Sequence, residues 1–175
     1  MTQHYSVLLT ESLELLNIRP DGMYLDCTAG MGGHTGAIAA RLSEAGTVIA
    51  NDRDSQSLEM ARANTAQYWD RIEFQHGAFS ELNHSNLDGM LADLGVSRFH
   101  LTDPERGFSF MSDGPLDMRL DQTRGMTAAD LVNHSAEKQI ADWLYQLGEE
   151  RRARKITGAL IRGRSEERRV GKECA

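Results

Sequence analysis

A glycine-rich segment and a later aspartate are the first residues in the chain that could bind a ligand. Gly30, Gly32 and Gly33 follow a short apolar segment, and Asp52 comes 22 residues after Gly30. Glycine lets the backbone approach a ligand that a Cβ would exclude, although a tight turn also needs glycine without any ligand. A carboxylate at the end of the next strand can accept hydrogen bonds from ribose hydroxyls. Together these residues predict a site for a cofactor that contains adenosine.

Asp26, which lies just before the glycines, favours one cofactor over another. A carboxylate repels the pyrophosphate of a dinucleotide and attracts the ammonium of S-adenosylmethionine. We therefore expect S-adenosylmethionine rather than NAD. Three structural alternatives stay open: Asp26 caps N–H groups of the turn, His34 caps the start of the helix, and Cys27 is a buried strand residue.

Two more candidates follow later strands. Phe79 comes after the third expected strand, where an adenine ring could lie against it, with packing in the core as the alternative. Asp93 ends the fourth expected strand. A carboxylate there can accept a hydrogen bond from an exocyclic amine during methylation, and capping of the following turn is its alternative role.

The elements that must position these residues alternate along the chain. The residue pattern predicts strands at 23–27, 47–52, 72–76 and 90–93, and helices at 7–16, 35–42 and 55–66. This alternation is typical of an α/β fold with a doubly wound parallel sheet. The alternation stops after residue 93, where a segment rich in Gly, Asp and Arg leads to helices expected from 127 and from 136 towards 156.

Length and composition exclude several classes of protein. The 175 residues, 40% hydrophobic and 26% charged, are sufficient for a globular core, and no apolar run is long enough to span a bilayer. The N-terminus has no signal-peptide pattern, so we expect a cytosolic protein. The two cysteines, Cys27 and Cys174, form neither a disulfide framework nor a metal-ligand spacing, and we expect no metal.

The net charge of −7 is unevenly distributed. Residues 1–100 contain six arginines, no lysine and 13 acidic residues, whereas residues 101–175 contain 13 residues of each sign. The densest basic run is residues 151–155. A polyanion would bind there, but a solvated helix face is the simpler interpretation of a single basic run.

Six blocks of sequence, in order along residues 4–156, carry a family resemblance. The most specific is 105–119, where Arg-Gly-Phe-Ser-Phe precedes Asp-Gly-Pro-Leu-Asp-Met-Arg; the others are 4–11, 26–35, 52–54, 76–79 and 93–97. The chain resembles the bacterial small-subunit rRNA cytosine-N4 methyltransferases of the RsmH (MraW) type. The resemblance implies an α/β, Rossmann-like S-adenosylmethionine-dependent methyltransferase sheet, of which strands 1–4 are present, with the start of a helical inserted domain.

The resemblance also implies an activity and its partners. The implied activity is methyl transfer from S-adenosylmethionine to the N4 amine of a cytidine in the decoding region of 16S rRNA. The implied partner is this rRNA in the small ribosomal subunit, the implied location is the cytoplasm, and no membrane is involved. A homodimer is compatible with this activity. The implied cofactor contacts are Gly32, Gly33, His34, Asp52, Phe79, Asp93 and His100, the last in place of a more frequent glutamine. Asp93 is also the expected catalytic residue.

The chemistry of the reaction points to substrate contacts in the segment after the fourth strand. The target base must leave its stack, and Phe108 or Phe110 could hold it while Arg106, Arg119 and Arg124 contact phosphates. For the two phenylalanines, packing within the segment itself is the alternative role.

We expect three regions along the chain. They are residues 1–102, the N-terminal part of the methyltransferase domain; 103–156, a substrate loop and the start of the helical insert; and 157–175, a non-native or atypical tail. Residues 164–175 have seven charges in 12 positions and no helical apolar spacing. Family members are longer and complete the sheet, which would leave the strand at 90–93 on an edge. A fragment that binds cofactor or RNA without turnover is therefore one alternative function, and an NAD-dependent oxidoreductase is another, disfavoured by Asp26 and the block around Gly107.

Overall fold

The computed structural model describes the backbone of residues 6–173 and the side chains of residues 6–164. Cys174 and the start of the block at 4–11 lie outside these residues. The chain forms two compact units that meet in sequence between Ser97 and Arg98. The boundary between the units lies earlier than the one expected after residue 102, because Arg98–Thr102 forms the short helix α4, which packs against the 3-10 turn η3 (Pro104–Arg106) of the second unit.

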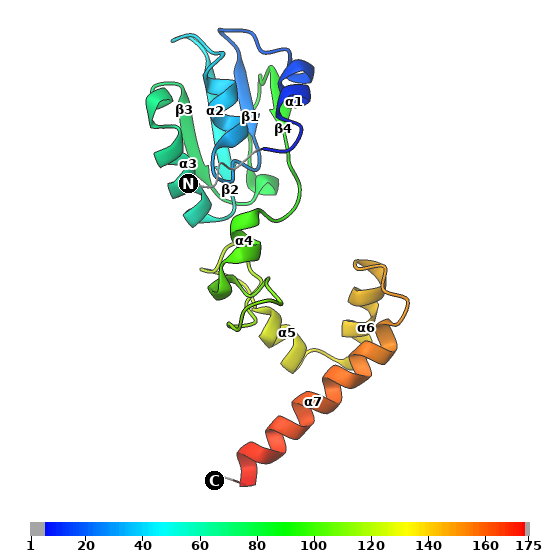
Figure 1. Ribbon diagram of the computed structural model, residues 1–175. Coiled ribbons are helices and arrows are strands. Elements are labelled where there is room, and N and C mark those ends of the chain that lie inside the picture. Colours follow the sequence, from blue (N-terminus) through cyan, green and yellow to red (C-terminus); the bar gives the residue numbers. More distant parts are fainter. Residues whose placement is uncertain (1–5, 174–175) are drawn as a thin grey trace. The chain divides into compact units, whose positions relative to one another are not determined.

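The first unit contains a parallel four-stranded sheet, which confirms the expected α/β class. Its strands are β1 (Met23–Asp26), β2 (Thr47–Asp52), β3 (Ile72–His76) and β4 (Gly89–Leu91), in the spatial order β3-β2-β1-β4 (Figure 1). The bounds of β2 and β3 match the predicted ranges, and β4 is shorter than predicted. Because the strand order reverses between β1 and β4, a topological switch point lies beside the carboxyl end of β1.

Three helices pack on one face of this sheet: α1 (Leu9–Leu16), α2 (Gly33–Ala39) and α3 (Ser55–Asn64), the last followed by the short η1 (Ala66–Tyr68). Their buried residues Leu13, Ile38 and Leu58 meet Tyr24 and Val48 in the main core. Successive strand residues point to opposite faces. The other face therefore carries a second cluster, in which Leu25, Cys27 and Ile49 pack against Leu82 and Leu87 from the segment between β3 and β4.

The second unit is helical. After α4 and η3, an irregular segment leads to α5 (Ala128–His134), α6 (Glu137–Gln146) and α7 (Ala153–Glu173). Thr127 and Asp130 form a capping box that begins α5 where the sequence predicts it. The prediction of one helix from 136 towards 156 is wrong: α6 ends at Gln146, followed by Gly148 and by Glu149 in the left-handed conformation, a backbone that ends a helix.

Helix α7 runs through the boundary expected at residue 157. The helix extends to Glu173 although residues 164–175 have no helical apolar spacing, because Glu, Arg and Lys favour helix by themselves. Within the second unit, Arg164 Nη1 donates to the carbonyl oxygens of Val132 and Ser135, both at 3.0 Å, and so caps the end of α5. No helix in the described part of the chain is both long enough and apolar enough to cross a bilayer.

Candidate cofactor site

The carboxyl ends of the four strands meet at one edge of the sheet, because all the strands are parallel. Side chains and backbone groups connect the loops at this edge. The amide of Asp93, after β4, donates to Thr28 Oγ1 at 2.7 Å, and the amide of Cys27 donates to the carbonyl of Leu91 at 2.8 Å. The structure therefore holds Asp93 beside the glycine loop that follows β1.

Asp52, the last residue of β2, organises this loop. Its Oδ2 accepts a hydrogen bond from the amide of Gly30 and its Oδ1 accepts one from the amide of Asp54, both at 2.8 Å. A carboxylate has about four acceptor positions. The half-buried Asp52 therefore retains capacity for two further donors, such as ribose hydroxyls.

Two glycines of the loop have positive φ for different reasons. At Gly32 (φ 87°), an added Cβ would lie 3.0 Å from Thr65 Cγ2 and 3.1 Å from Ala61 Cα, so this glycine lets the loop pack against α3. At Gly30 (φ 53°), the nearest atom to an added Cβ would be Thr28 O at 3.9 Å, so the space beside this residue is open. Gly30, rather than Gly32, is therefore the position that leaves room for a ligand.

Asp26 has the capping role that the sequence left as an alternative. It is fully buried, its Oδ1 accepts from the amide of Thr28 at 3.1 Å, and its Oδ2 accepts from Thr35 Oγ1 at 2.7 Å. Burial is the main cause that raises its pKa above the ordinary value. Cys27 is likewise a buried strand-end residue, and burial, followed by the charge of Asp26, raises the pKa of its thiol. Asp26 offers no exposed oxygen to an ammonium.

Two buried polar side chains next to the loop have unused hydrogen-bonding atoms: His34 follows the loop in sequence, and Asn51 meets it from β2. His34 in α2 is 6% exposed, and its Nε2 has no partner among the described residues; the structure gives it no capping bond. Asn51, in β2, donates from Nδ2 to the carbonyls of Cys27 and Gly77 at 3.1 and 3.2 Å, while its Oδ1 has no partner within the described chain. Buried polar atoms without partners are uncommon, and a polar ligand would explain them.

Asn51 was not among the predicted site residues, although it joins the ends of β1 and β3. A signal was present, because an amide in the apolar strand 47–52 is unusual. Phe79 begins the 3-10 turn η2 (Phe79–Glu81) two residues after Gly77, and is 52% exposed, so it does not fill the core. The carboxylate-bearing Asp93 is exposed. Phe79 and Asp93 are therefore both accessible at this edge.

The other predicted site residues belong to the second unit, where several have structural roles. His100 is buried, and its ring centroid lies 5.9 Å from that of Phe108, so Phe108 packs within the segment. Phe110 is 95% exposed. Arg106 is 1% exposed and donates to Gln122 Oε1 at 3.1 Å and to the carbonyl of Leu120 at 2.9 Å, so its guanidinium is not presented to a phosphate.

Arg119 is also engaged within the second unit. Its Nε and Nη2 donate to the two oxygens of Asp117 at 2.9 and 2.7 Å, and its Nη1 donates to the carbonyl of Gly125 at 3.1 Å. These bonds lower the pKa of Asp117, with the side-chain bond from Arg119 as the largest cause. Arg119 therefore closes the loop that precedes α5.

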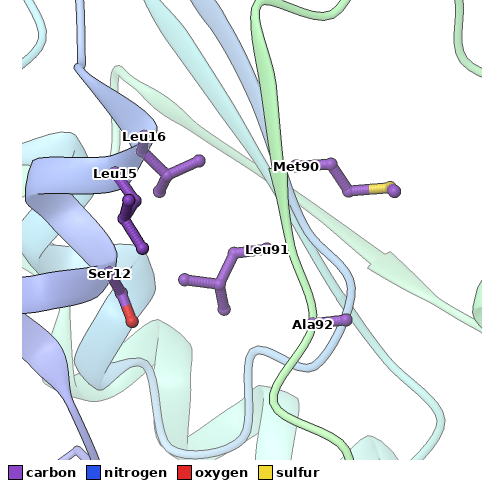
Figure 2. A pocket seen from close by; sticks show the side chains of 6 residues that line it. All are labelled: Ser12, Leu15, Leu16, Met90, Leu91 and Ala92. Atoms are coloured by element: carbon purple, nitrogen blue, oxygen red, sulfur yellow. The ribbon is translucent and has the colours of Figure 1, made fainter.

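A separate, mainly apolar pocket of about 300 Å³ opens between α1 and β4 (Figure 2). Its lining consists of Ser12, Leu15, Leu16, Met90, Leu91 and Ala92. These side chains include no titratable or strongly nucleophilic group, so the pocket is not where chemistry would occur. In the part of the chain that the structure describes, no three His, Cys, Asp or Glu side chains are grouped so that they could hold a metal ion.

The model of the MraW methylase family matches residues 1–172, which is nearly the whole chain. The chain belongs to this family. The match extends into the expected tail, whose interpretation as foreign sequence remains a prediction. A relative from Solibacter usitatus (strain Ellin6076), named "Ribosomal RNA small subunit methyltransferase H", is 60% identical over 168 residues, which are 92% of this chain and 58% of the relative. A protein of the same name from Koribacter versatilis (strain Ellin345) is 45% identical over 172 residues, covering 92% of this chain and 55% of that protein.

This MraW family member thus spans a little over half the length of the curated relatives it matches. Solved structures show weaker similarity. An RNA methyltransferase from Salinibacter ruber in complex with S-adenosyl-L-homocysteine is 18% identical, with a TM-score of 0.45, and the match covers 52% of this chain and 60% of that one. A putative rRNA-methylase from Clostridium thermocellum is 16% identical, with a TM-score of 0.40 and coverage of 46% and 48%.

Proposed function

We propose that this chain carries the cofactor site of an S-adenosylmethionine-dependent methyltransferase that modifies the N4 amine of a cytidine in the decoding region of 16S rRNA. The observation that carries the proposal is the bond from the amide of Gly30 to Asp52, which joins an open glycine loop to a carboxylate at the switch point of a parallel sheet. Membership of a methylase family supports it. An rRNA substrate would place the protein in the cytoplasm.

The residues at this edge fit the chemical groups of the cofactor. Asp52 has acceptor positions left for ribose hydroxyls, and the exposed ring of Phe79 offers a surface for adenine. Two unpartnered atoms could bind polar groups of the ligand. Nε2 of His34 can donate or accept a hydrogen bond, depending on the tautomer, and Oδ1 of Asn51 can accept one. When bound, S-adenosylmethionine supplies an electrophilic methyl group on its sulfonium.

Asp93 is the proposed catalytic residue. The lone pair of the cytosine N4 amine is delocalised into the ring, so the amine must be oriented and allowed to pyramidalise before it attacks a methyl group. The exposed carboxylate of Asp93 can accept a hydrogen bond from this amine, and its backbone is held by Thr28. The aspartate would thereby turn the nitrogen lone pair towards the methyl donor.

In the second unit, considered by itself, Phe110 is the proposed stacking surface for an RNA base. It is 95% exposed, whereas Phe108 packs against His100. Aromatic stacking holds an unstacked base without reading its sequence. We leave Arg106 and Arg119 out of the proposed phosphate contacts, because their guanidinium groups are used within the unit. A contact of His100 with the cofactor, and a homodimer, remain predictions.

A second candidate function is binding of cofactor or RNA without turnover. The chain spans 58% of its Solibacter usitatus relative, and the described edge of β4 has no neighbouring strand. A chain of this length would bind cofactor or RNA without turnover if the rest of the protein is needed to complete the active site.

Titration calorimetry and a methylation assay test the two functions together. We expect the purified chain to bind S-adenosylhomocysteine more tightly than NAD, and a version extended to the length of its relatives to methylate 30S subunits. Binding without methylation by the 175-residue chain would support the second function for this chain. NAD binding as tight as that of S-adenosylhomocysteine would overturn the cofactor assignment.

A further inference from the structure

The start of α7 and the turn before it carry a run of positive charge. We define the basic stripe as Arg151, Arg152, Arg154, Lys155 and Arg162; all five side chains are exposed. Residues 151–164 contain no acidic residue, although the whole chain has a net charge of −7. Solvated surfaces usually mix the two signs. A run of one sign in an acidic protein therefore calls for a physical explanation.

The geometry of α7 directs part of the stripe away from the packed side of the helix. Lys155 and Arg162 are seven residues apart and share one face at 3.6 residues per turn. Ala153 and Thr157, each two residues from Lys155, are buried, and α7 packs against α6 and α5 (Figure 1). Two residues correspond to about 200° around a helix. Lys155 and Arg162 therefore lie opposite the face that packs within the second unit.

The stripe also lacks the ion pairs that neutralise other cations of this unit. Arg119 pairs with Asp117, Arg124 with Asp121 and Lys138 with Asp142. None of the five stripe side chains has a hydrogen-bond or ion-pair partner among the residues whose side chains are described.

Two acidic groups lie near the stripe, and neither forms a described ion pair with it. Glu150 Oε1 accepts a hydrogen bond from the backbone amide of Arg152 at 2.7 Å, and Glu137 lies near Gly158. A Cβ added at Gly158 would lie 3.9 Å from Glu137 Oε1 and 3.6 Å from Arg162 Nη1, yet these two charged groups form no ion pair. Among the residues whose side chains are described, the stripe therefore has no carboxylate paired with it.

We propose that the basic stripe is a contact surface for the phosphate backbone of RNA. The inference rests on the proposed function, from which the RNA substrate comes. Lys155 and Arg162 are separated by about 10 Å along the axis of α7, so they would contact different phosphates. An anionic membrane fits less well, because a helix that lies in a membrane inserts an apolar face, and the buried face of α7 is already packed within the unit.

Fluorescence anisotropy with a labelled RNA from the decoding region of 16S rRNA tests the stripe in the 175-residue chain. We expect the double variant Lys155→Gln/Arg162→Gln to bind about tenfold more weakly at about 0.15 M salt, and the slope of log K against log salt to fall in magnitude by about 1.4. The matched control is Arg41→Gln/Lys138→Gln, which removes one exposed arginine and one exposed lysine elsewhere. It should bind within about twofold of the unmodified chain. Circular dichroism melting shows whether each variant is folded.

Three results would overturn the proposal. The two double variants could weaken RNA binding equally, or the unmodified chain could fail to bind RNA. The third result is that the stripe variant weakens binding to phosphatidylserine vesicles as much as it weakens binding to RNA. Calorimetry with S-adenosylhomocysteine separates this inference from the proposed function. If the chain binds the cofactor but its RNA binding does not depend on the stripe, only the proposed role of the stripe is contradicted. Stripe-dependent RNA binding without any cofactor binding contradicts only the methyltransferase assignment.

Discussion

At the scale of single residues, the most informative feature is a carboxylate with two tasks. Asp52 holds the glycine loop through the amide of Gly30 and the next turn through the amide of Asp54, and it has acceptor positions left for a ligand. A structural role and a binding role thus coincide in one side chain. Experiments on this residue must separate the two.

Asp52→Ala should weaken binding of S-adenosylhomocysteine by about 1–3 kcal/mol, because hydrogen bonds to a charged group are lost. Titration calorimetry measures the change. The control is Asp21→Ala, an exposed carboxylate in the turn before β1, which should leave the affinity unchanged. Equal affinity of the Asp52 variant and the unmodified chain would show that this carboxylate only shapes the loop.

Asp26→Asn should leave the free energy of unfolding at neutral pH at or above its original value. The amide oxygen can still accept from the amide of Thr28, and the NH₂ group can donate to Thr35 Oγ1. The variant also has no ionisable group at this position, where burial disfavours the charged form. Urea unfolding measures the effect. Asp26→Ala is the contrasting variant, and should cost about 1–3 kcal/mol because both donors lose their acceptor.

The same aspartate predicts a pH dependence. Because burial raises its pKa in the folded state, the folded chain keeps this proton at pH values where the unfolded chain has lost it. The contribution of Asp26 to stability therefore falls as the pH rises through the interval above 3.8. Asp26→Asn should flatten this part of the profile. A variant with an unchanged profile would contradict the assignment to Asp26.

Asp93→Ala should abolish most methyl transfer in a version extended to the length of the relatives, while cofactor affinity stays within about tenfold. The reason is that the proposed role of the carboxylate is in part to orient the amine, in addition to its implied contact with the cofactor. Mass spectrometry of rRNA from a deletion strain complemented with the variant checks the N4-methyl mark. A mark at the original level would exclude a catalytic role for Asp93.

At the scale of elements, the sheet ends in the edge strand β4. β4 pairs with β1 and has no strand on its other side among the described residues. The side chain of its Met90 points away from α1 and is 63% exposed (Figure 2). An open edge with apolar side chains favours association with other chains. This feature follows the expectation that the strand at 90–93 would lie on an edge.

Met90→Lys should reduce self-association of the chain, because a lysine on an edge strand opposes edge-to-edge pairing. Light scattering after size-exclusion chromatography measures the change. Trp69→Lys is the control: Trp69 is 78% exposed and lies outside the strands, so this variant should associate like the unmodified chain. If both variants reduce association equally, general charge rather than the edge is responsible.

At the scale of the whole molecule, the chain has two units and spans 58% of its Solibacter usitatus relative. A four-stranded sheet with helices on one face buries less apolar surface than a sheet covered on both faces. Its margin of stability should therefore be below the 5–15 kcal/mol typical of intact domains.

We expect the purified 175-residue chain to melt at low temperature or aggregate, and to leave 30S subunits unmethylated. Differential scanning calorimetry and incorporation of labelled methyl groups measure the two outcomes. The extended version is the control for the methylation assay. A monodisperse chain that unfolds cooperatively and methylates 30S subunits would show that the rest of the protein is dispensable.

Several features of this protein could be predicted from the sequence because they depend on local pattern. The alternation of apolar segments and helices indicated the four strands and the α/β class, and Asp52 was recognised from its place after the second strand. Helix bounds were less predictable. Gly148 and Glu149 divide α6 from α7 through backbone conformation, which apolar periodicity does not report.

Only the tertiary structure decided what surrounds each side chain. Arg106 was a candidate phosphate contact in the sequence, but it is buried against Leu120 and Gln122, 14 and 16 residues away. The capping role of Asp26 depended on Thr35, and the exposure of Phe110 distinguished it from the packed Phe108. The physical reason is that burial and hydrogen-bond partners depend on contacts between residues that are distant along the chain, whereas strand and helix periodicity is contained in neighbouring residues.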